Sequence, residues 1–448
     1  MFSPDFVLQR SLTLLHEKIW VIFADKETKD STGFVIHEFA VDHQKQGLVL
    51  DCWRSLNPSS QTFHACRGRG SAVPRVLTTK VLRESSPTAA VSVDHSACAV
   101  SRTNVQHLGG LTMTGITATW RKVASSEILK RSSQIVSVIG DKALIFGGEL
   151  KPREPRDNDV HVVSLGKYIN DSSLLSRTTS AQAPSPRVGS ASAVIQEKIY
   201  LFSGRGGLAM APIEETGSVW EFDSTSSAWS QIKPDEDSAY PAARSYHCMA
   251  SDGVDTLFVH AGCPETGRLS DLWAFEVSSR KWIQLASAPE PPRGGTSIAF
   301  ANGLLYRMNG FDGKTELGGN LDVYDCKSNT WSSVTFPADD ISGPSPRSVS
   351  ALVALNIRSR SSIITLFGER DPSSLGHQGA GKMAGDVWAY DIESRKWREV
   401  NFTEGHEPAA RGWFAADVLK SLKGDGLVVH GGLGENNERL DDIWVLEF

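Results

Sequence analysis

The sequence lacks the signatures of several protein classes. Its six cysteines include no Cys-x-x-Cys pair, which excludes zinc and redox motifs of that spacing. No apolar run approaches the roughly 18 residues that a membrane-spanning helix needs, and no Gly-x-Ser-x-Gly motif is present. The net charge of −6 argues against a dedicated nucleic-acid surface. We therefore expect neither a membrane nor a nucleic acid as partner. The scattered cysteines favour a cytoplasmic protein, and the alternative is a secreted protein with a disulfide.

What the sequence does contain is an internal repeat with six copies. Each copy opens with an Arg, usually behind a Pro, and continues with an apolar strand that ends in Gly. An apolar-aromatic strand follows, often with a Trp behind it, and such alternation is typical of half-buried strands. The opening residues, spaced 49 to 64 positions apart, are Arg131, Arg187, Arg244, Arg293, Arg347 and Arg411.

This pattern resembles kelch repeats, which form the blades of β-propellers. A single blade cannot bury both of its faces, so blades stack into a ring that leaves only short edges. The sixth copy ends at Phe448, directly after its third strand, while Thr117–Val123 has the form of a fourth strand. We predict an all-β, six-bladed kelch β-propeller over residues 116–448, with ring closure by this N-terminal strand.

Residues 1–115 form an irregular N-terminal extension. Lys18–Phe23 and Phe34–Phe39 have a blade-like pattern, and three origins stay open: a degenerate extra blade, a separate small β element, or wrongly assigned coding sequence. Residues 56–105 are rich in Ser, Thr and Arg without sustained periodicity. That composition predicts a flexible, partly disordered loop.

The opening arginines should converge around one mouth of the central channel, because the loop between the second and third strands opens on the same face. Arg presents planar, forked donors that match sulfate, phosphate or carboxylate. Arg131 and Arg187 could therefore hold an anionic ligand there. The alternative is that each opening Arg pairs with an acidic residue of the propeller, since a repeated residue more often has a repeated structural role.

The fifth copy breaks the symmetry with a long loop, residues 368–385. Long loops on a rigid scaffold often carry function. This one holds Glu369, Asp371 and His377, and carboxylates with one imidazole resemble the ligand set of non-haem Fe(II). The alternative is a loop folded by turns and salt bridges. By contrast, His260 and His430 precede Gly in apolar strands and are predicted to lie in the core.

The runs Ile145–Glu149 and Gly368–Gly381 resemble those of plant specifier proteins, the nitrile-, epithio- and thiocyanate-forming kelch propellers that redirect glucosinolate aglycone breakdown with Fe(II). The resemblance covers all six copies. It implies a lyase in which Arg131 and Arg187 match the arginines that hold the aglycone sulfate.

In that family the iron ligands follow Glu-xxx-Asp-xxx-His. Glu369 and His377 match the outer positions, whereas the middle position is Ser373. Asp371, two residues earlier, is the carboxylate that would take its place. The resemblance thus implies an Fe(II) site made by Glu369, Asp371 and His377.

Two functions follow from these observations. The first is an Fe(II)-dependent lyase of the specifier type that acts on a small anionic, sulfated substrate. The second is a non-enzymatic scaffold that binds a protein partner on the loop face. A chelator should abolish the first activity and leave the second unchanged.

Overall fold

The structure is a computed structural model. It describes strands within residues 18–64 and then residues 115–166, 174–374, 379–421 and 424–448. The chain divides into two compact units, Met1–Thr112 and Met113–Phe448. Among the described residues, no helix has the length and apolar character needed to cross a membrane.

The first unit contains one antiparallel sheet in the order β1-β2-β3-β4. Both blade-like segments predicted in this region are strands of this sheet. Apart from Leu56 and β4, the predicted loop 56–105 lies outside the described residues. The strands are β1 (Lys18–Ala24), β2 (Phe34–Asp42), β3 (Gly47–Leu56) and β4 (Phe63–His64).

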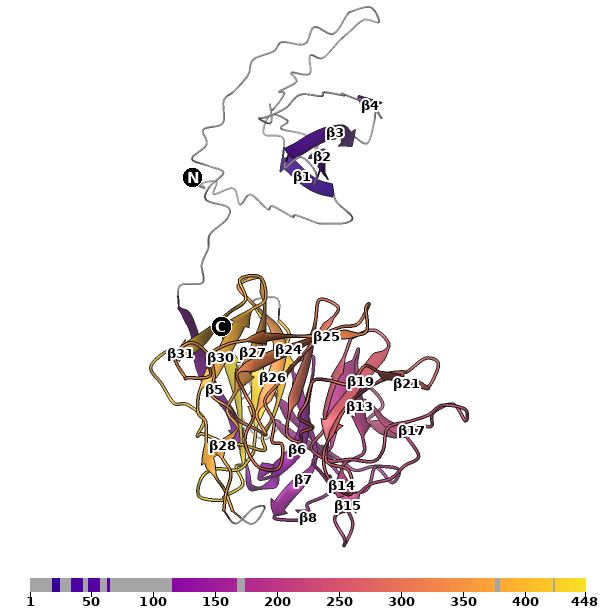
Figure 1. Cartoon of the computed structure of the whole chain (residues 1–448), viewed down its shortest axis with the longest axis vertical. Coiled ribbons are helices and arrows are strands. Elements are labelled where there is room, and N and C mark those ends of the chain that lie inside the picture. The colour runs from indigo at the N-terminus through magenta and orange to yellow at the C-terminus, as the bar shows by residue number, and fades with distance from the viewer. Residues whose placement is uncertain are drawn as a thin grey trace, which may run out of the picture. The chain divides into compact units, whose positions relative to one another are not determined.

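The described part of the second unit consists of antiparallel four-stranded sets, called blades 1 to 6 in chain order (Figure 1). Blade 1 has β6 (Ser132–Ile139), β7 (Lys142–Lys151), β9 (Val160–Ser164) and β10 (Leu175–Thr178). Blade 2 has β12 (Ala191–Ile195), β13 (Lys198–Phe202), β16 (Val219–Asp223) and β17 (Ala228–Ile232). Blade 3 has β18 (Cys248–Ser251), β19 (Thr256–Gly262), β20 (Leu269–Glu276) and β21 (Lys281–Leu285).

The later blades repeat this arrangement. Blade 4 has β22 (Ser297–Ala301), β23 (Leu304–Met308), β24 (Asn320–Asp325) and β25 (Thr330–Thr335). Blade 5 has β26 (Ala351–Ile357), β27 (Arg360–Leu366), β30 (Val387–Asp391) and β31 (Lys396–Phe402). Blade 6 has β32 (Ala415–Leu419), β33 (Gly426–His430), β34 (Asp442–Glu447) and β5 (Ile116–Ser125).

Short elements lie between these strands. They are η2 (Glu127–Leu129), a 3-10 turn, and β8 (Glu154–Pro155), β11 (Arg187–Val188), β14 (Arg205–Gly206), β15 (Ala211–Pro212), β28 (Glu369–Asp371) and β29 (Lys382–Met383). Figure 1 shows β8, β14, β15 and β28 at one end of the propeller.

The first strand of the second unit completes its last blade. β5 pairs antiparallel with β34, with Trp120 opposite Leu446. It also meets β31 of blade 5 in a short parallel ladder, where Ile116 faces Val400. The pairing predicted for Thr117–Val123 is thus confirmed, and blade 6 combines the two ends of the unit.

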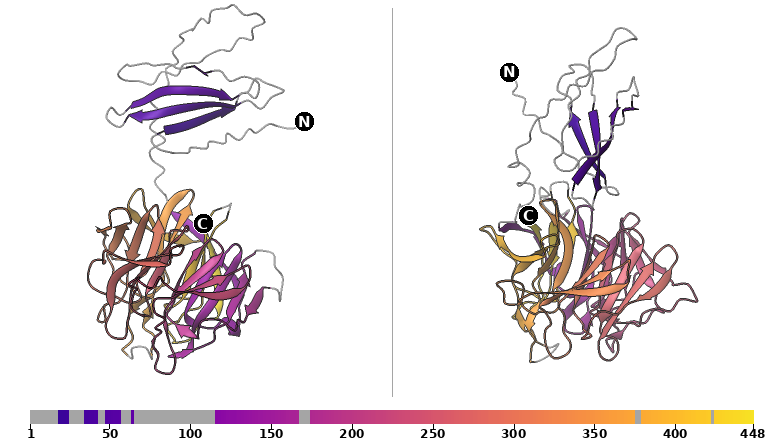
Figure 2. Two further views of the ribbon diagram at one scale, coloured as in Figure 1. Left: turned by 90° about the vertical axis from the view of Figure 1, so that its right-hand side faces the viewer. Right: turned by 45° about the horizontal axis from the view of Figure 1, so that its top comes forward.

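The innermost strands contact one another in a closed cycle, β6, β12, β18, β22, β26, β32 and back to β6. Figure 2 shows the blades of this unit in two further views. A ring of backbone hydrogen bonds reinforces this cycle at one end. In each blade, the residue two positions after the opening Arg donates its N–H to the equivalent carbonyl of a neighbouring blade, over 2.7 to 3.1 Å. We call this set the mouth ring: Ser133, Gly189, Tyr246, Gly295, Val349 and Trp413.

The hydrophobic core lies between neighbouring blades. Each core cluster joins strands of two adjacent blades, including one between blades 6 and 1. Trp229 from blade 2, for example, packs against Phe146 of blade 1 with 5.0 Å between ring centroids. Burial of a large aromatic ring is the main driving force for such stacking, and each ring buries about 150–250 Å².

Candidate functional site

The opening arginines are internal structural residues. All are at most 7% exposed, and each Nη1 donates to the carbonyl at the end of its own second strand. Five also grip a carboxylate with both terminal nitrogens, at 2.5 to 3.3 Å. The pairs are Arg131–Asp157, Arg187–Glu215, Arg244–Asp271, Arg347–Asp386 and Arg411–Asp442.

Arg131 and Arg187 therefore lie where the alternative prediction put them. Their exposures are 0% and 1%, and their forks are occupied by Asp157 and Glu215. Burial lowers the pKa of Arg131, and Asp157 only partly offsets this effect. Both guanidinium groups thus already bind carboxylates of their own blades. The role of the two arginines in holding an anion stays a prediction.

Arg293 is the exception among the opening arginines. Its guanidinium donates to the carbonyls of Pro291 and Asn309 and has no carboxylate partner in the described residues. Burial, followed by the nearby charge of Arg307, lowers the pKa of Arg293 to about 10.

The two histidines predicted to be core residues are fully buried, which confirms that prediction. His260 contacts the carbonyl of Asp271 through Nδ1 at 2.7 Å, and His430 contacts that of Leu129 through Nε2 at 3.1 Å. Burial lowers the pKa of both imidazoles, so both are neutral near pH 7.

Two of the three predicted metal ligands in the fifth-blade loop have different environments, one buried and one exposed. Glu369 is 5% exposed, and its Oε1 accepts the N–H of Gly381 at 2.9 Å. The Asp371 side chain is 72% exposed and lies 3.7 Å from Lys382 Nζ. His377, the third predicted ligand, lies outside the described residues.

The described residues fit a metal at Glu369 but not at Asp371. Burial raises the pKa of Glu369 to about 7, as expected for a carboxylate that lacks a cation. Asp371 already faces solvent and Lys382.

A group of three candidate ligands does occur elsewhere in the described residues, at Asp157, Asp159 and His161. Burial would raise the pKa of Asp157, but His161 and the charge of Arg131 outweigh it and lower that pKa to about 2. Asp157 already forms an ion pair with Arg131, so this cluster has a structural role that needs no metal.

A second ring of side chains surrounds the mouth ring. In each blade, the residue directly after the strand-end Gly bridges the residue that follows the opening Arg. We call these the rim positions: Glu149, Arg205, Cys263, Phe311, Glu369 and Leu433. Their chemistry differs from blade to blade, whereas the opening Arg is the same in all.

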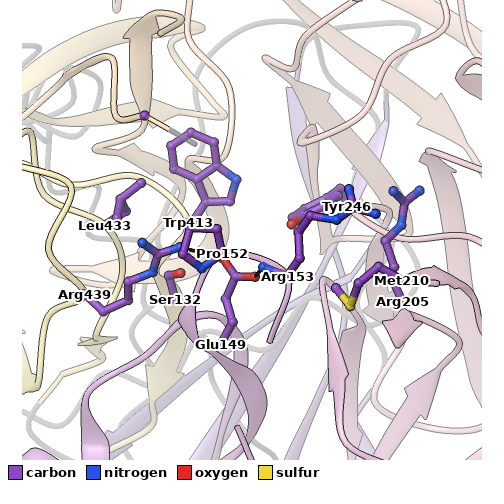
Figure 3. Close-up of a pocket in the computed structure, with 11 residues that line it drawn as sticks. Ser132, Glu149, Pro152, Arg153, Arg205, Met210, Tyr246, Trp413, Leu433 and Arg439 are labelled. Atoms are coloured by element: carbon purple, nitrogen blue, oxygen red, sulfur yellow. Dashed lines mark hydrogen bonds and ion pairs between the residues drawn. The ribbon is translucent and has the colours of Figure 1, made fainter. Parts of the chain in front are cut away.

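A hollow open to solvent lies within these rings, and its empty space of about 520 Å³ includes solvent outside the protein. Tyr246 and Trp413 line it from positions three steps apart in the mouth ring, which are opposite one another (Figure 3). Both have a φ of 51°, and every residue of the mouth ring has positive φ, between 44° and 63°. This conformation therefore belongs to the ring, and the two aromatic side chains are what distinguish these positions. Gly379 of the fifth-blade loop also lines the hollow.

The hollow holds both satisfied and unsatisfied charges. Arg439 donates to Glu149 at 2.7 Å, so this pair is internally neutralised. Arg205, on the side of Tyr246 in Figure 3, has no carboxylate partner among the described residues, and its buried Nε has no hydrogen bond. Arg153, more exposed, is likewise free of a carboxylate in the described residues.

Tyr246 is a neutral hydrogen-bonding group in this hollow. Burial, with a further contribution from Glu149, raises the pKa of the Tyr246 phenol to about 12. The hollow thus combines an unpaired guanidinium, a phenol and an indole wall. It is suited to a small anion that carries an apolar group.

Sequence reasoning missed Arg205, Tyr246 and Trp413. Their common signal was available, since each varies at a position defined by the repeat: the rim for Arg205, and two residues after the opening Arg for the aromatics. It also missed Glu316, which bridges the rim residue Phe311 at the mouth. Burial raises the pKa of Glu316 to about 8.

Comparisons with known proteins agree with this architecture. The KLHDC2/KLHL20/DRC7 Kelch-repeats domain family matches residues 133–368, just over half of the chain. The chain therefore belongs to this family of kelch-repeat propellers. The solved structure of YjhT has the same fold, with a TM-score of 0.54 and 13% identity, over 72% of this chain and 95% of that one.

Two curated relatives differ in what their names say. N-(sulfonatooxy)prop-2-enimidothioate sulfolyase from Thlaspi arvense is 29% identical over 340 residues, which cover 70% of this chain and 91% of the relative. Kelch domain-containing protein 10 from Homo sapiens is 26% identical over 233 residues, half of each protein. The similarity to a specifier-type protein is thus confirmed.

Proposed function

We propose that this propeller binds a small organic anion in the hollow at its mouth and acts on it as a lyase of the specifier type. The observation that carries the proposal is Arg205, a cation without a carboxylate partner in the described residues, in a hollow walled by Tyr246 and Trp413. The sulfolyase named above, which matches over most of its own length, supports a sulfated substrate.

The residues would divide the work as follows. Arg205, helped by Arg153, would bind the anionic group, because forked donors in a partly buried site bind such groups strongly. Tyr246 would donate a hydrogen bond, and Trp413 would cover the apolar part and exclude water. These roles replace those that the resemblance implied for Arg131 and Arg187.

Fe(II), when bound, would supply Lewis-acid chemistry to this site. Glu369 would hold it, with His377 as the further ligand that the resemblance implies. Glu369 fits because its carboxylate is buried without a cation nearby. A cytoplasmic location, which keeps thiols reduced, is consistent with this assignment and stays a prediction.

Anion binding is tested by calorimetry with phenyl sulfate. The intact protein should bind it, and Arg205→Gln should weaken binding about tenfold or more, since a hydrogen bond to a charged group contributes about 1.5–3 kcal/mol. Arg280→Gln, an exposed Arg on the β20–β21 turn, is the matched control. Equal affinity in all three proteins would exclude the hollow as the anion site.

Activity is tested by the organic products formed from N-(sulfonatooxy)prop-2-enimidothioate with and without the protein. We expect a protein-dependent product that disappears with chelator and returns with Fe(II). Phenyl sulfate binding without any change of product would leave a binding protein and remove the lyase.

A protein-binding scaffold is the second candidate. Leu208 and Ile341 are large apolar side chains with 109% and 84% exposure, on loops of blade 2 and of the blade 4–5 connection. Each is a single apolar side chain, which is a small area compared with a typical interface. A partner that binds at Leu208 should be lost with Leu208→Ser and retained with Arg205→Gln.

A further inference from the structure

One contact pattern occurs twice at the mouth with different charges. In blade 6, Arg439 lies opposite the rim residue Leu433 and reaches Glu149, the rim residue of the next blade, at 2.7 Å. In blade 4, Glu316 lies opposite the rim residue Phe311 in the same kind of bridge. The rim residue of the blade that follows is Glu369.

The Arg439–Glu149 and Glu316–Glu369 pairs thus occupy equivalent positions in the repeat, but their net charges differ. Arg439 and Glu149 neutralise one another, whereas Glu316 and Glu369 are both carboxyl groups. The Phe311–Glu316 and Ser348–Glu369 bridges place both residues at the mouth in neighbouring blades, in the same way as the Leu433–Arg439 and Ser132–Glu149 bridges place the other pair. Two carboxylates in one buried site cannot both ionise without a cation.

The carboxylate of Glu316 has no adequate partner. Both oxygens are buried to below 1 Å² and have no hydrogen bond of ordinary geometry, although the Ser348 hydroxyl lies beside them and lowers the pKa. Arg268 is the cation that interacts with this group. Its guanidinium lies over the Phe311 ring, 5.1 Å from the centroid, and forms no ion pair among the described residues.

We propose that Glu316 and Glu369 jointly bind a divalent cation that bridges blades 4 and 5 at the mouth. The cation would take the place that Arg439 fills between blades 6 and 1. Paired carboxylates are ligands that Fe(II), Mn(II) and other hard divalent ions accept. This inference deepens the proposed function, on which it rests for the choice of Fe(II), and adds a ligand from outside the fifth-blade loop.

The test is metal binding by the intact protein, without substrate. Fe(II) is titrated anaerobically by calorimetry, and Mn(II) binding is followed by loss of the free-ion EPR signal. The variants are Glu316→Gln and Glu369→Gln, which keep the side-chain shape. Glu404→Gln, an exposed residue after β31, is the matched control.

We expect one site in the intact protein and in the control. Each of the two other variants should lose affinity at least tenfold. Without metal, Glu316→Gln should melt at a higher temperature than the intact protein, because the variant no longer buries an ionisable carboxyl group that lacks a partner. A melting temperature that rises with Mn(II) in the intact protein but not in Glu316→Gln would support joint ligation.

Two results would overturn the inference, and they differ in what they leave standing. If Glu316→Gln binds metal like the intact protein while Glu369→Gln does not, Glu316 is no ligand and the proposed lyase survives. If the intact protein binds neither ion, the pair shares a proton and the iron-dependent lyase falls as well. Phenyl sulfate binding would then still report separately on the anion site.

Discussion

In every blade the rim residue bridges the residue that follows the opening Arg, yet the two sets of residues have different roles. The arginines are the same in all blades, buried, and with one exception paired with a carboxylate. The rim residues are acidic, basic, aromatic, aliphatic or thiol, and three of them, Glu149, Arg205 and Leu433, line the hollow. In this propeller, the residue that is the same in every blade has a structural role, and the positions that differ between blades contribute to the candidate site.

The same contrast separates the tryptophans. Trp229, Trp282 and Trp397 follow third strands and are at most 8% exposed between blades. Trp413 stands in the mouth ring at φ 51° and lines the hollow. The same residue type thus contributes to the core in one place and to the wall of the hollow in the other.

The largest effect should come from breaking a repeated Arg pair. Arg411→Ala would leave Asp442 buried without its cation, and loss of one partner of a buried pair costs about 3–5 kcal/mol. Urea denaturation measures it. Arg205→Ala is the matched control and should change the free energy of unfolding by less than about 0.5 kcal/mol. A similar loss of unfolding free energy in both variants would contradict the distinction between structural opening arginines and rim residues of the candidate site.

The next effect compares two tryptophans. Trp229→Ala should lower the free energy of unfolding by about 3 kcal/mol, because it removes a ring buried against Phe146 and Phe222. Trp413→Ala should change it by less than about 1 kcal/mol, since the mouth ring uses its backbone, but should weaken phenyl sulfate binding. The reverse order of stabilities would place Trp413 in the core.

A smaller effect concerns the seam between blades 6 and 1. Asp417 on β32 accepts the N–H of Val138 on β6 at 2.7 Å, and burial raises its pKa to about 6. The folded state therefore binds the proton more tightly than the unfolded state, whose Asp has an ordinary pKa near 4. Stability should fall by about 2 kcal/mol as the pH rises from 4 to 6, and then level off.

The control for that prediction is Asp417→Asn, which keeps an acceptor and removes the titration. Denaturation curves at pH 4 and pH 7 should differ less in this variant than in the intact protein. An unchanged pH dependence would show that Asp417 does not titrate in this window.

The fold could be predicted from sequence because its signals recur. The opening Arg, the strand-end Gly and the third-strand aromatics each appear in several copies, and Thr117–Val123 could be assigned from the missing fourth strand. Of the described residues in the candidate site, only Glu369 could be singled out from the sequence, and its role stays a prediction. Arg205, Tyr246, Trp413 and Glu316 come together from separate blades, and no local pattern encodes contacts across such distances in the chain.

The smallest effect tests where sequence and structure diverge most directly. The family pattern made Asp371 the substitute for the missing middle ligand, but its side chain is 72% exposed and only 3.7 Å from Lys382 Nζ. Asp371→Asn should change stability by less than about 0.5 kcal/mol, because surface ion pairs contribute little. It should also leave Mn(II) affinity unchanged, whereas Glu369→Gln lowers it at least tenfold. Equal loss in both variants would mean that the loop folds Asp371 inward around the cation, and that the spacing read from the sequence was the better guide.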